Sequence, residues 1–258
     1  MHRAQAPILF AALVLAGAGF AQQAGDSRRS GYDMMQPSLQ EMERDDGTNP
    51  AMLWVREGKS LWSQKLGPDA KSCADCHGDA TQTMRGAAAR YPAFDAAAQK
   101  PIDLAGRIQQ CRTERQHATP LARESRGLNA LASYVSLQSR GLAITPPQDA
   151  RLDATRAQGA ALFNARMGQL NLSCAACHDA NAGQKLGGSL IPQAHPTGYP
   201  IYRLEWQDIG SLQRRLRNCM IGVRAEPFPS GSAEYIALEA YLMQRAAGMA
   251  MDAPGVRP

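Results

Sequence analysis

Apolar residues recur at helical spacing in four stretches of the chain. The first begins after Asn49 and Pro50, which suit a helix N-cap and first helical position, and continues to Gly67. A similar stretch runs from about residue 153 to 167. Two later stretches, near residues 131–138 and 238–242, repeat apolar positions three and four apart, and each closes at a glycine. No segment shows sustained apolar–polar alternation between turn signals, so the pattern predicts a mainly α protein.

The two halves of the chain repeat three blocks in the same order. At an offset of 101 residues, the first block superimposes Gly58, Leu61, Trp62, Gly67, Ser72, Cys73, Cys76 and His77 on Gly159, Leu162, Phe163, Gly168, Ser173, Cys174, Cys177 and His178. At an offset of 108, the second places Leu104, Arg107, Ile108 and Cys111 on Leu212, Arg215, Leu216 and Cys219. At an offset of 107, the third places Ala130, Leu131, Tyr134 and Val135 on Ala237, Leu238, Tyr241 and Leu242. The repeat predicts two domains of one kind.

Prolines mark the predicted boundary between these domains. Residues 144–149 (ITPPQD) should stop a helix and form a short, stiff connection. We therefore expect one domain over residues 49–145 and the other over 146–258. Residues 22–48 are polar and match nothing in the second half. They are expected to be an extension, either a disordered arm or a segment packed on a partner.

The N-terminus is typical of a secretory signal peptide. His2 and Arg3 precede an apolar run over residues 8–20, which is too short to span a bilayer as a helix. Gly19 and Ala21 are small residues of the kind that signal peptidase accepts. We expect residues 1–21 to be removed on export.

Composition narrows the function classes further. The net charge is +5, without a lysine-rich run or interleaved basic and aromatic residues, so nucleic-acid binding is not indicated. Aromatic residues make up 6% of the chain, so the core of each small domain is thin. A buried prosthetic group would supply the missing apolar surface.

Two Cys-x-x-Cys-His motifs indicate what that group is. In this motif two thiols add to the vinyl groups of a haem, and the adjacent histidine reaches the iron. Zinc and thioredoxin-like redox sites also use Cys-x-x-Cys pairs, but neither needs the duplicated histidine. The sequence therefore predicts two covalently bound haems, and an opening helix, a haem loop and a closing helix in each half resemble the class I cytochrome c fold. The motif residues are Cys73, Cys76 and His77, and Cys174, Cys177 and His178.

Two cysteines remain, Cys111 and Cys219, at equivalent positions of the repeat. A disulfide between them is the ordinary expectation for an exported protein. Side chains at equivalent positions of a repeat, however, should each face the centre of their own domain rather than each other. A disulfide also needs the two Cα atoms within about 7 Å, which is demanding for residues of separate domains. We prefer ligation of one iron by each cysteine.

Methionine and histidine are the usual sixth ligands of haem iron. No candidate has a partner of its kind at the equivalent place in the other half. We expect the methionines to pack in the core and the two histidines to lie on the surface or in loops. These candidates are Met84, Met167, Met220, Met243, Met249, His117 and His195.

Residues 211–219 (SLQRRLRNC), residues 223–227 (VRAEP) and the stretch from Tyr235 to Tyr241 resemble the diheme A subunit of the SoxAX cytochromes of sulfur oxidation. The resemblance covers essentially the whole mature chain. It implies an L-cysteine S-thiosulfotransferase, which joins thiosulfate oxidatively to a cysteine of the SoxYZ carrier protein while electrons leave through haem. It also implies a monoheme cytochrome c partner, SoxX, and a periplasmic location.

The resemblance also implies residue roles. His77 and Cys111 would ligate the first haem iron, and His178 and Cys219 the second. Cys219 would be the catalytic cysteine, carrying a persulfide, and Arg215 would bind the substrate.

Physical reasoning supports the role of Arg215. If the segment is helical, residues four apart share one face, so its guanidinium can lie beside the sulfur of Cys219. A forked donor suits the oxygens of a dianion. Arg107 holds the equivalent place before Cys111, so an arginine there does not by itself indicate catalysis. Three further arginines could attract anions or could simply form a solvated helix face: Arg214, Arg217 and Arg224.

Two other functions stay open. A thiosulfate dehydrogenase would couple two thiosulfates to tetrathionate. In that family the iron of the second haem normally has a methionine ligand. A plain diheme electron carrier would have methionine or histidine ligands in both halves. The two equivalent cysteines favour the transferase.

Overall fold

Residues 26–258 are described by a computed structural model, so the predicted signal peptide lies outside the described residues. Within this part of the chain no helix is long and apolar enough to cross a bilayer. Helices predominate, as predicted. They are α1 (Pro37–Arg44), α2 (Met52–Ser63), α3 (Cys73–His77), α4 (Ala80–Thr83), α5 (Leu104–Glu114), α6 (Arg126–Leu137), α7 (Asp153–Asn164), α8 (Cys174–His178), α9 (Leu212–Gly222) and α10 (Ala233–Arg245), with short 3-10 helices η1 (Ala88–Arg90) and η2 (Ala150–Leu152).

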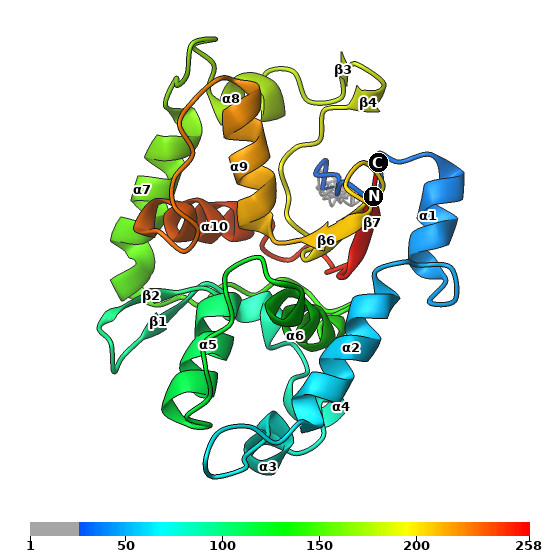
Figure 1. Cartoon of the computed structure of the whole chain (residues 1–258). Coiled ribbons are helices and arrows are strands. Elements are labelled where there is room, and N and C mark those ends of the chain that lie inside the picture. The colour runs from blue at the N-terminus through cyan, green and yellow to red at the C-terminus, as the bar shows by residue number, and fades with distance from the viewer. Residues whose placement is uncertain (1–25) are drawn as a thin grey trace, which may run out of the picture.

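The strands are two or three residues long. They are β1 (Ala93–Asp95), β2 (Lys100–Ile102), β3 (Lys185–Leu186), β4 (Ser189–Leu190), β5 (Ile201–Arg203), β6 (Asp208–Gly210) and β7 (Gly255–Arg257). Figure 1 shows two lobes, one built from α2 to α6 and the other from α7 to α10. The predicted division into two similar halves is therefore visible in the architecture.

Each lobe is built on one crossing of two helices. In the first lobe α2 packs on α6, and in the second α7 packs on α10. A glycine lies at each crossing: a Cβ atom on Gly58 would lie 2.1 Å from the carbonyl oxygen of Ala130, and one on Gly159 would lie 2.0 Å from that of Ala237. The backbones thus approach more closely than any side chain would allow. This explains why the repeat places a glycine at both positions.

Each lobe also carries one small antiparallel hairpin at the same place. In the first lobe Ala93 pairs with Ile102 and Asp95 with Lys100; in the second Ile201 pairs with Gly210 and Arg203 with Asp208. All of these residues correspond at the offset of 108 that relates Cys111 to Cys219. In the second lobe β5 pairs in addition with β7, in parallel.

The start of the first repeat helix differs from the prediction. Helix α2 begins at Met52, with Ala51 as N-cap, rather than after Asn49 and Pro50. The side chain of Asn49 instead donates to the carbonyl oxygens of Glu43 (3.1 Å) and Pro254 (3.2 Å) and accepts from the N–H of Ala51 (2.9 Å). The amide oxygen of Asn49 therefore still caps the turn before α2, while its amide nitrogen joins this turn to distant segments.

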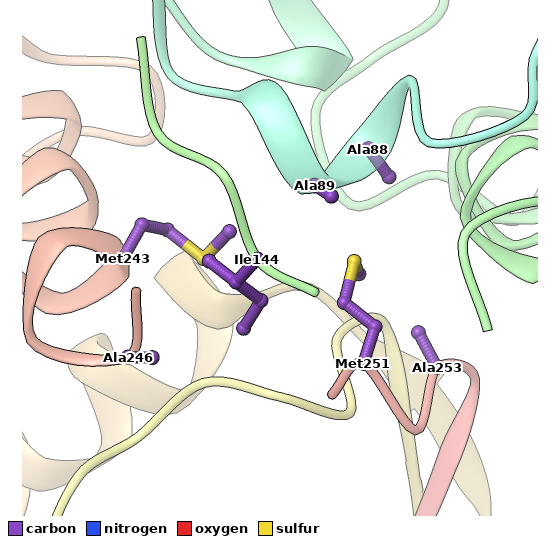
Figure 2. Packing of buried hydrophobic residues seen from close by; sticks show 7 residues of the cluster. All are labelled: Ala88, Ala89, Ile144, Met243, Ala246, Met251 and Ala253. Atoms are coloured by element: carbon purple, nitrogen blue, oxygen red, sulfur yellow. The ribbon is translucent and has the colours of Figure 1, made fainter. Parts of the chain in front are cut away.

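The segment between the lobes is anchored at its start by a buried residue, Ile144. Ile144 is 1% exposed and belongs to an interlobe core. Figure 2 shows Ile144 beside Met243, with the residues of η1 on one side and those that follow α10 on the other. The complete cluster is Ala88, Ala89, Ile144, Met243, Ala246, Met251 and Ala253. The two lobes therefore share a core.

Polar contacts join the lobes as well. Ser211, the N-cap of α9, binds the carboxylate of Glu124 through its backbone N–H (3.3 Å) and through its hydroxyl. Gln213 is 2% exposed, and its side-chain amide donates to Asp103 Oδ2 (2.9 Å). Asp103 is itself the N-cap of α5. The first lobe thus holds the N-terminus of the helix that carries Cys219.

The described part of the N-terminal extension packs on the chain itself. Helix α1 lies against β7. Glu43 accepts from the N–H of Val256 (2.6 Å) and forms a buried ion pair with Arg257. Residues 37–44 are therefore an ordered helix held on the chain's own C-terminal strand.

Candidate functional site

A cavity of about 500 Å³ opens between α8, α9, the β3–β4 hairpin and α1. It is large enough for a prosthetic group or a small ligand. Among its lining residues are His178, Cys219 and Arg215, which the sequence predicts to act together. Arg203 and Tyr199 line it too.

Helix α8 carries the second Cys-x-x-Cys-His motif and places its histidine, His178, at this cavity. Ser173 caps the helix by accepting from the N–H of Ala176 (3.1 Å), so both thiols and the imidazole project from a single short helix. The Nδ1 atom of His178 lies 2.6 Å from the carbonyl oxygen of Pro192. This hydrogen bond makes Nδ1 the protonated nitrogen and leaves Nε2 free to ligate a metal. The donor set therefore fits a covalently held haem.

Cys219 lies on α9 and faces His178. Burial raises the pKa of its thiol, but a hydrogen bond with His178 and the positive charges of Arg215 and Arg203 outweigh that effect and bring the pKa below its ordinary value. A thiol favoured as thiolate is suited to metal ligation and to sulfur chemistry.

The surroundings of Cys219 are positive and rich in donors. Arg215 lies one turn earlier on the same face of α9, as predicted. Burial, together with the nearby charge of Arg215, lowers the pKa of Arg203, because two guanidinium groups close together disfavour each other's charge. Burial raises the pKa of Tyr199 to about 12, so its phenol stays protonated and can donate a hydrogen bond at neutral pH.

The first motif has the same local geometry in the first lobe. Ser72 and Asp75 form a capping box at the start of α3. The ring of His77 lies 5.7 Å from that of Trp62, much as His178 lies 6.5 Å from Phe163. Residues of this motif lie near Cys111, since the charge of Cys76 acts on its pKa.

Cys111 differs from its equivalent in its electrostatics. Burial raises the pKa of the Cys111 thiol, and the charges of Arg107 and Arg115 do not compensate for it. Arg107 is paired with Asp95, at 3.5 Å from Nη1 to Oδ2. The two predicted iron-ligating cysteines thus occupy equivalent places with opposite pKa shifts.

All six cysteines are free thiols in the structure, and Cys111 and Cys219 lie in different lobes without a bridge. The exposed His117 interacts with Asp69 through Nδ1 (3.1 Å). The Nδ1 atom of His195 lies 3.0 Å from the carbonyl oxygen of Arg29, in a loop at the cavity. The methionines weighed as ligands all pack in or against the apolar clusters, as predicted: Met84, Met167, Met220, Met243 and Met249.

The family model described as "SoxA/TsdA, cytochrome c domain" matches residues 57–144 and 158–251, one match in each lobe. The chain belongs to the SoxA/TsdA cytochrome c family. The predicted fold of two tandem cytochrome c domains and the predicted family are confirmed. As a member of this family the chain carries covalently bound haem c.

Relatives of the SoxA branch cover nearly the whole chain. The L-cysteine S-thiosulfotransferase subunit SoxA of Pseudaminobacter salicylatoxidans is 36% identical over 90% of this chain and 82% of its own length. The subunit of the same name from Rhodovulum sulfidophilum is 32% identical over 90% of this chain and 81% of its own. The crystal structure of SoxXA from P. pantotrophus superimposes with a TM-score of 0.86 at 33% identity, covering 90% of this chain and 87% of that one.

Sequence reasoning missed Arg203 and Tyr199. Both come from the segment before α9, where three-residue strands leave no periodic signal. Extending the offset of 108 backward from Cys219 would have placed Arg203 on Asp95 and shown an inversion of charge.

Proposed function

We propose that this chain is the SoxA subunit of an L-cysteine S-thiosulfotransferase. The proposal is carried by one observation: a single cavity brings together Cys219, whose pKa is lowered, Arg215 and the histidine of a Cys-x-x-Cys-His motif. The reaction joins a thiol of a carrier protein to the terminal sulfur of thiosulfate. One sulfur–sulfur bond forms, the thiol loses its proton, and two electrons leave.

The proposed haem sites follow the two motifs. Cys73 and Cys76 would hold the first haem, with His77 and Cys111 as iron ligands. In the second lobe the corresponding residues are Cys174 and Cys177 for attachment, and His178 and Cys219 for the iron. The haems would supply the acceptor for electrons. A thiolate ligand stabilises ferric iron and lowers the potential relative to methionine.

The chain's own residues would position the reacting sulfur atoms. Cys219 is the proposed catalytic residue, and as a persulfide it would hold sulfur at the base of the cavity. The Arg215 guanidinium donates hydrogen bonds to the oxygens of thiosulfate, and the phenol of Tyr199 supplies another donor. Binding the anionic end in this way leaves the terminal sulfur free to meet the carrier's thiol.

Two partner proteins belong to the proposal. The P. pantotrophus structure that this chain resembles is a complex named SoxXA, so a monoheme cytochrome c of the SoxX type is the proposed electron acceptor and subunit. The proposed substrate protein is the SoxYZ carrier. Export by the predicted signal peptide would place the reaction in the periplasm.

Turnover with thiosulfate and the carrier protein tests the function. The assay follows reduction of cytochrome c and the mass of the carrier, which should increase by one thiosulfate group. Cys219→Ser should abolish transfer, whereas Arg217→Gln, a change at an exposed residue of the same helix, should retain it. Oxidation of thiosulfate to tetrathionate without the carrier would instead identify a thiosulfate dehydrogenase, and electron transfer without either product would leave a plain electron carrier.

A further inference from the structure

The two lobes place residues of opposite charge at one equivalent position. Asp95 ends β1 and Arg203 ends β5, and the paired registers of the two hairpins make these residues equivalent. The same offset of 108 relates Arg107 to Arg215 and Cys111 to Cys219. The arginine that precedes each cysteine by one helical turn therefore has a different neighbour in each lobe.

In the first lobe this neighbour neutralises the arginine. Asp95 Oδ2 lies 3.5 Å from Arg107 Nη1, and the Asp95 side chain is 4% exposed. The other oxygen of Asp95 is fixed by the N–H groups of Ala97 (2.9 Å) and Ala98 (3.2 Å). The guanidinium of Arg107 also donates to Gln110 (2.5 Å). A carboxylate of the protein thus already occupies the place where an external anion would meet Arg107.

In the second lobe Arg203 and Arg215 line the cavity together, with the exposed Lys185 of the β3–β4 hairpin also at its edge. Within residues 26–258 the Arg215 side chain makes no hydrogen bond or ion pair with another residue, although Arg215 lines the cavity with Cys219. Arg203 lines it as well, is 13% exposed, and pairs with Glu205 (2.6 Å) through Nη2 alone. Its Nε atom is buried without a partner. A third arginine at the cavity, Arg257, is already bound by two carboxylates.

Glu205 is 65% exposed and offsets the charge of Arg203 only in part, so an anion in the cavity would stabilise this arrangement. Like charges held together in a partly buried site destabilise the protein, and an unpaired buried donor adds to the cost. An oxyanion that accepts hydrogen bonds from both guanidinium groups removes both penalties. A dianion gains more than a monoanion, because each of its charges faces one arginine.

We propose that Arg203 is a second anion-binding residue of the Cys219 site, and that Asp95 closes the equivalent place in the first lobe to anions. The identity of the dianion rests on the proposed function. On that basis the dianion is thiosulfate, and its oxygens are shared between Arg203 and Arg215. The two lobes would then differ in substrate access although both carry a cysteine at the haem. Thiosulfate would bind once per chain.

The test compares thiosulfate binding by calorimetry among variants of the full haem-loaded protein with its cytochrome partner. Arg203→Gln removes the positive charge, and Arg203→Lys retains the charge but lacks the forked donors of the guanidinium. Arg203→Asp introduces the residue type that the first lobe has at the equivalent position, Asp95. Arg214→Gln is the control. The guanidinium groups of Arg203 (5.3 Å) and Arg214 (4.4 Å) both lie over the Trp206 ring, but Arg214 pairs with Asp208 (2.8 Å) and does not line the cavity. Haem absorbance establishes that each variant is folded.

Arg203→Gln should weaken thiosulfate binding about tenfold or more, and Arg203→Asp should weaken it further, because the new carboxylate would pair with Arg215. Arg203→Lys should retain more affinity than Arg203→Gln. Arg214→Gln should stay within about twofold, because Arg214 is paired with Asp208 and lies outside the cavity lining. The KM for thiosulfate should rise in parallel with these losses.

Wild-type affinity in Arg203→Gln, or binding by Arg203→Asp no weaker than by Arg203→Gln, would overturn the role of Arg203. Two equivalent thiosulfate sites per wild-type chain would overturn the role of Asp95. The measurements also distinguish a failure of this inference from a failure of the proposed function. Binding that depends on Arg203 without transfer to the carrier would refute the function alone, whereas normal turnover with an unchanged KM in Arg203→Gln would refute the inference alone.

Discussion

At the scale of single residues, Cys219 and Cys111 show how two copies of one motif acquire different chemistry. Both lie one turn after an arginine and in the lobe of a Cys-x-x-Cys-His motif. The pKa of Cys219 falls and that of Cys111 rises, each from its ordinary value. The hydrogen bond with His178, followed by the charges of Arg215 and Arg203, separates Cys219 from Cys111, because burial raises the pKa of both thiols.

Arg215→Gln should impair use of thiosulfate while the haem spectra stay unchanged. We expect kcat/KM to fall by about ten- to a hundredfold, because a charge-assisted hydrogen bond to the substrate is lost. Arg217→Gln is the matched control, since Arg217 lies exposed on the same helix. Steady-state kinetics with the carrier protein measure both variants, and equal activity of Arg215→Gln and Arg217→Gln would contradict the role of Arg215.

Most of the site could be predicted from sequence at this scale, and the omissions have a physical reason. Cysteine and histidine in a fixed spacing identify haem attachment without reference to the fold. Arg203 reaches the cavity only because a short hairpin turns β5 toward α9. No local pattern encodes such a contact.

At the scale of elements, the helix crossings hold each lobe together. Gly159→Ala would place a methyl group 2.0 Å from the carbonyl oxygen of Ala237, so α7 and α10 would have to separate. We expect a loss of about 1–3 kcal/mol in the free energy of unfolding. Gly222→Ala, where nothing lies within 4 Å, should be neutral or slightly stabilising. Denaturant unfolding measures both, and an equal effect would show that the close crossing does not matter.

The four longest helices of the described residues were predictable, and the strands were not. The stretches predicted to be helical correspond to α2, α7, α6 and α10, because long apolar periodicity survives in any tertiary context. The short strands depend on pairing between segments, which no local pattern encodes. Such features arise from the assembled molecule.

At the scale of the whole molecule, the first lobe supports the second. Gln213→Ala would remove the hydrogen bond to Asp103 and the acceptor of the Gly231 N–H (2.7 Å). Loss of a buried hydrogen bond to a charged group should lower the free energy of unfolding by about 1.5–3 kcal/mol. Gln244→Ala, on the exposed face of α10, is the control and should change it by less than about 0.5 kcal/mol. Thermal unfolding measures both variants. Equal midpoints for Gln213→Ala and Gln244→Ala would show that this interlobe contact does not stabilise the fold.

The segment between the lobes should also respond to pH. Asp149 caps η2, and its hydrogen bonds with Arg151 lower the pKa of its carboxyl to about 2 from 3.8. A carboxyl with a lowered pKa in the folded state stabilises that state above its unfolded pKa and loses the effect as pH falls toward the folded value. Asp149→Asn should therefore be less stable than wild type at pH 6, and the difference should disappear between about pH 4 and pH 2.

Unfolding of Asp149→Asn and wild type across this range measures the effect. Asp153→Asn provides the comparison, because the side chain of Asp153 is 70% exposed in its pair with Arg156 and should contribute little. A stability difference that did not depend on pH would contradict the assigned cause.

The most direct test of the account is electron paramagnetic resonance of the oxidised protein, because everything proposed depends on the sulfur of Cys219 lying at haem iron. We predict two low-spin ferric signals of the thiolate type. Cys219→Ser should remove one of them, and Cys111→Ser the other. A wild-type signal typical of methionine or histidine ligation at the second haem, or a spectrum unchanged by Cys219→Ser, would contradict the account.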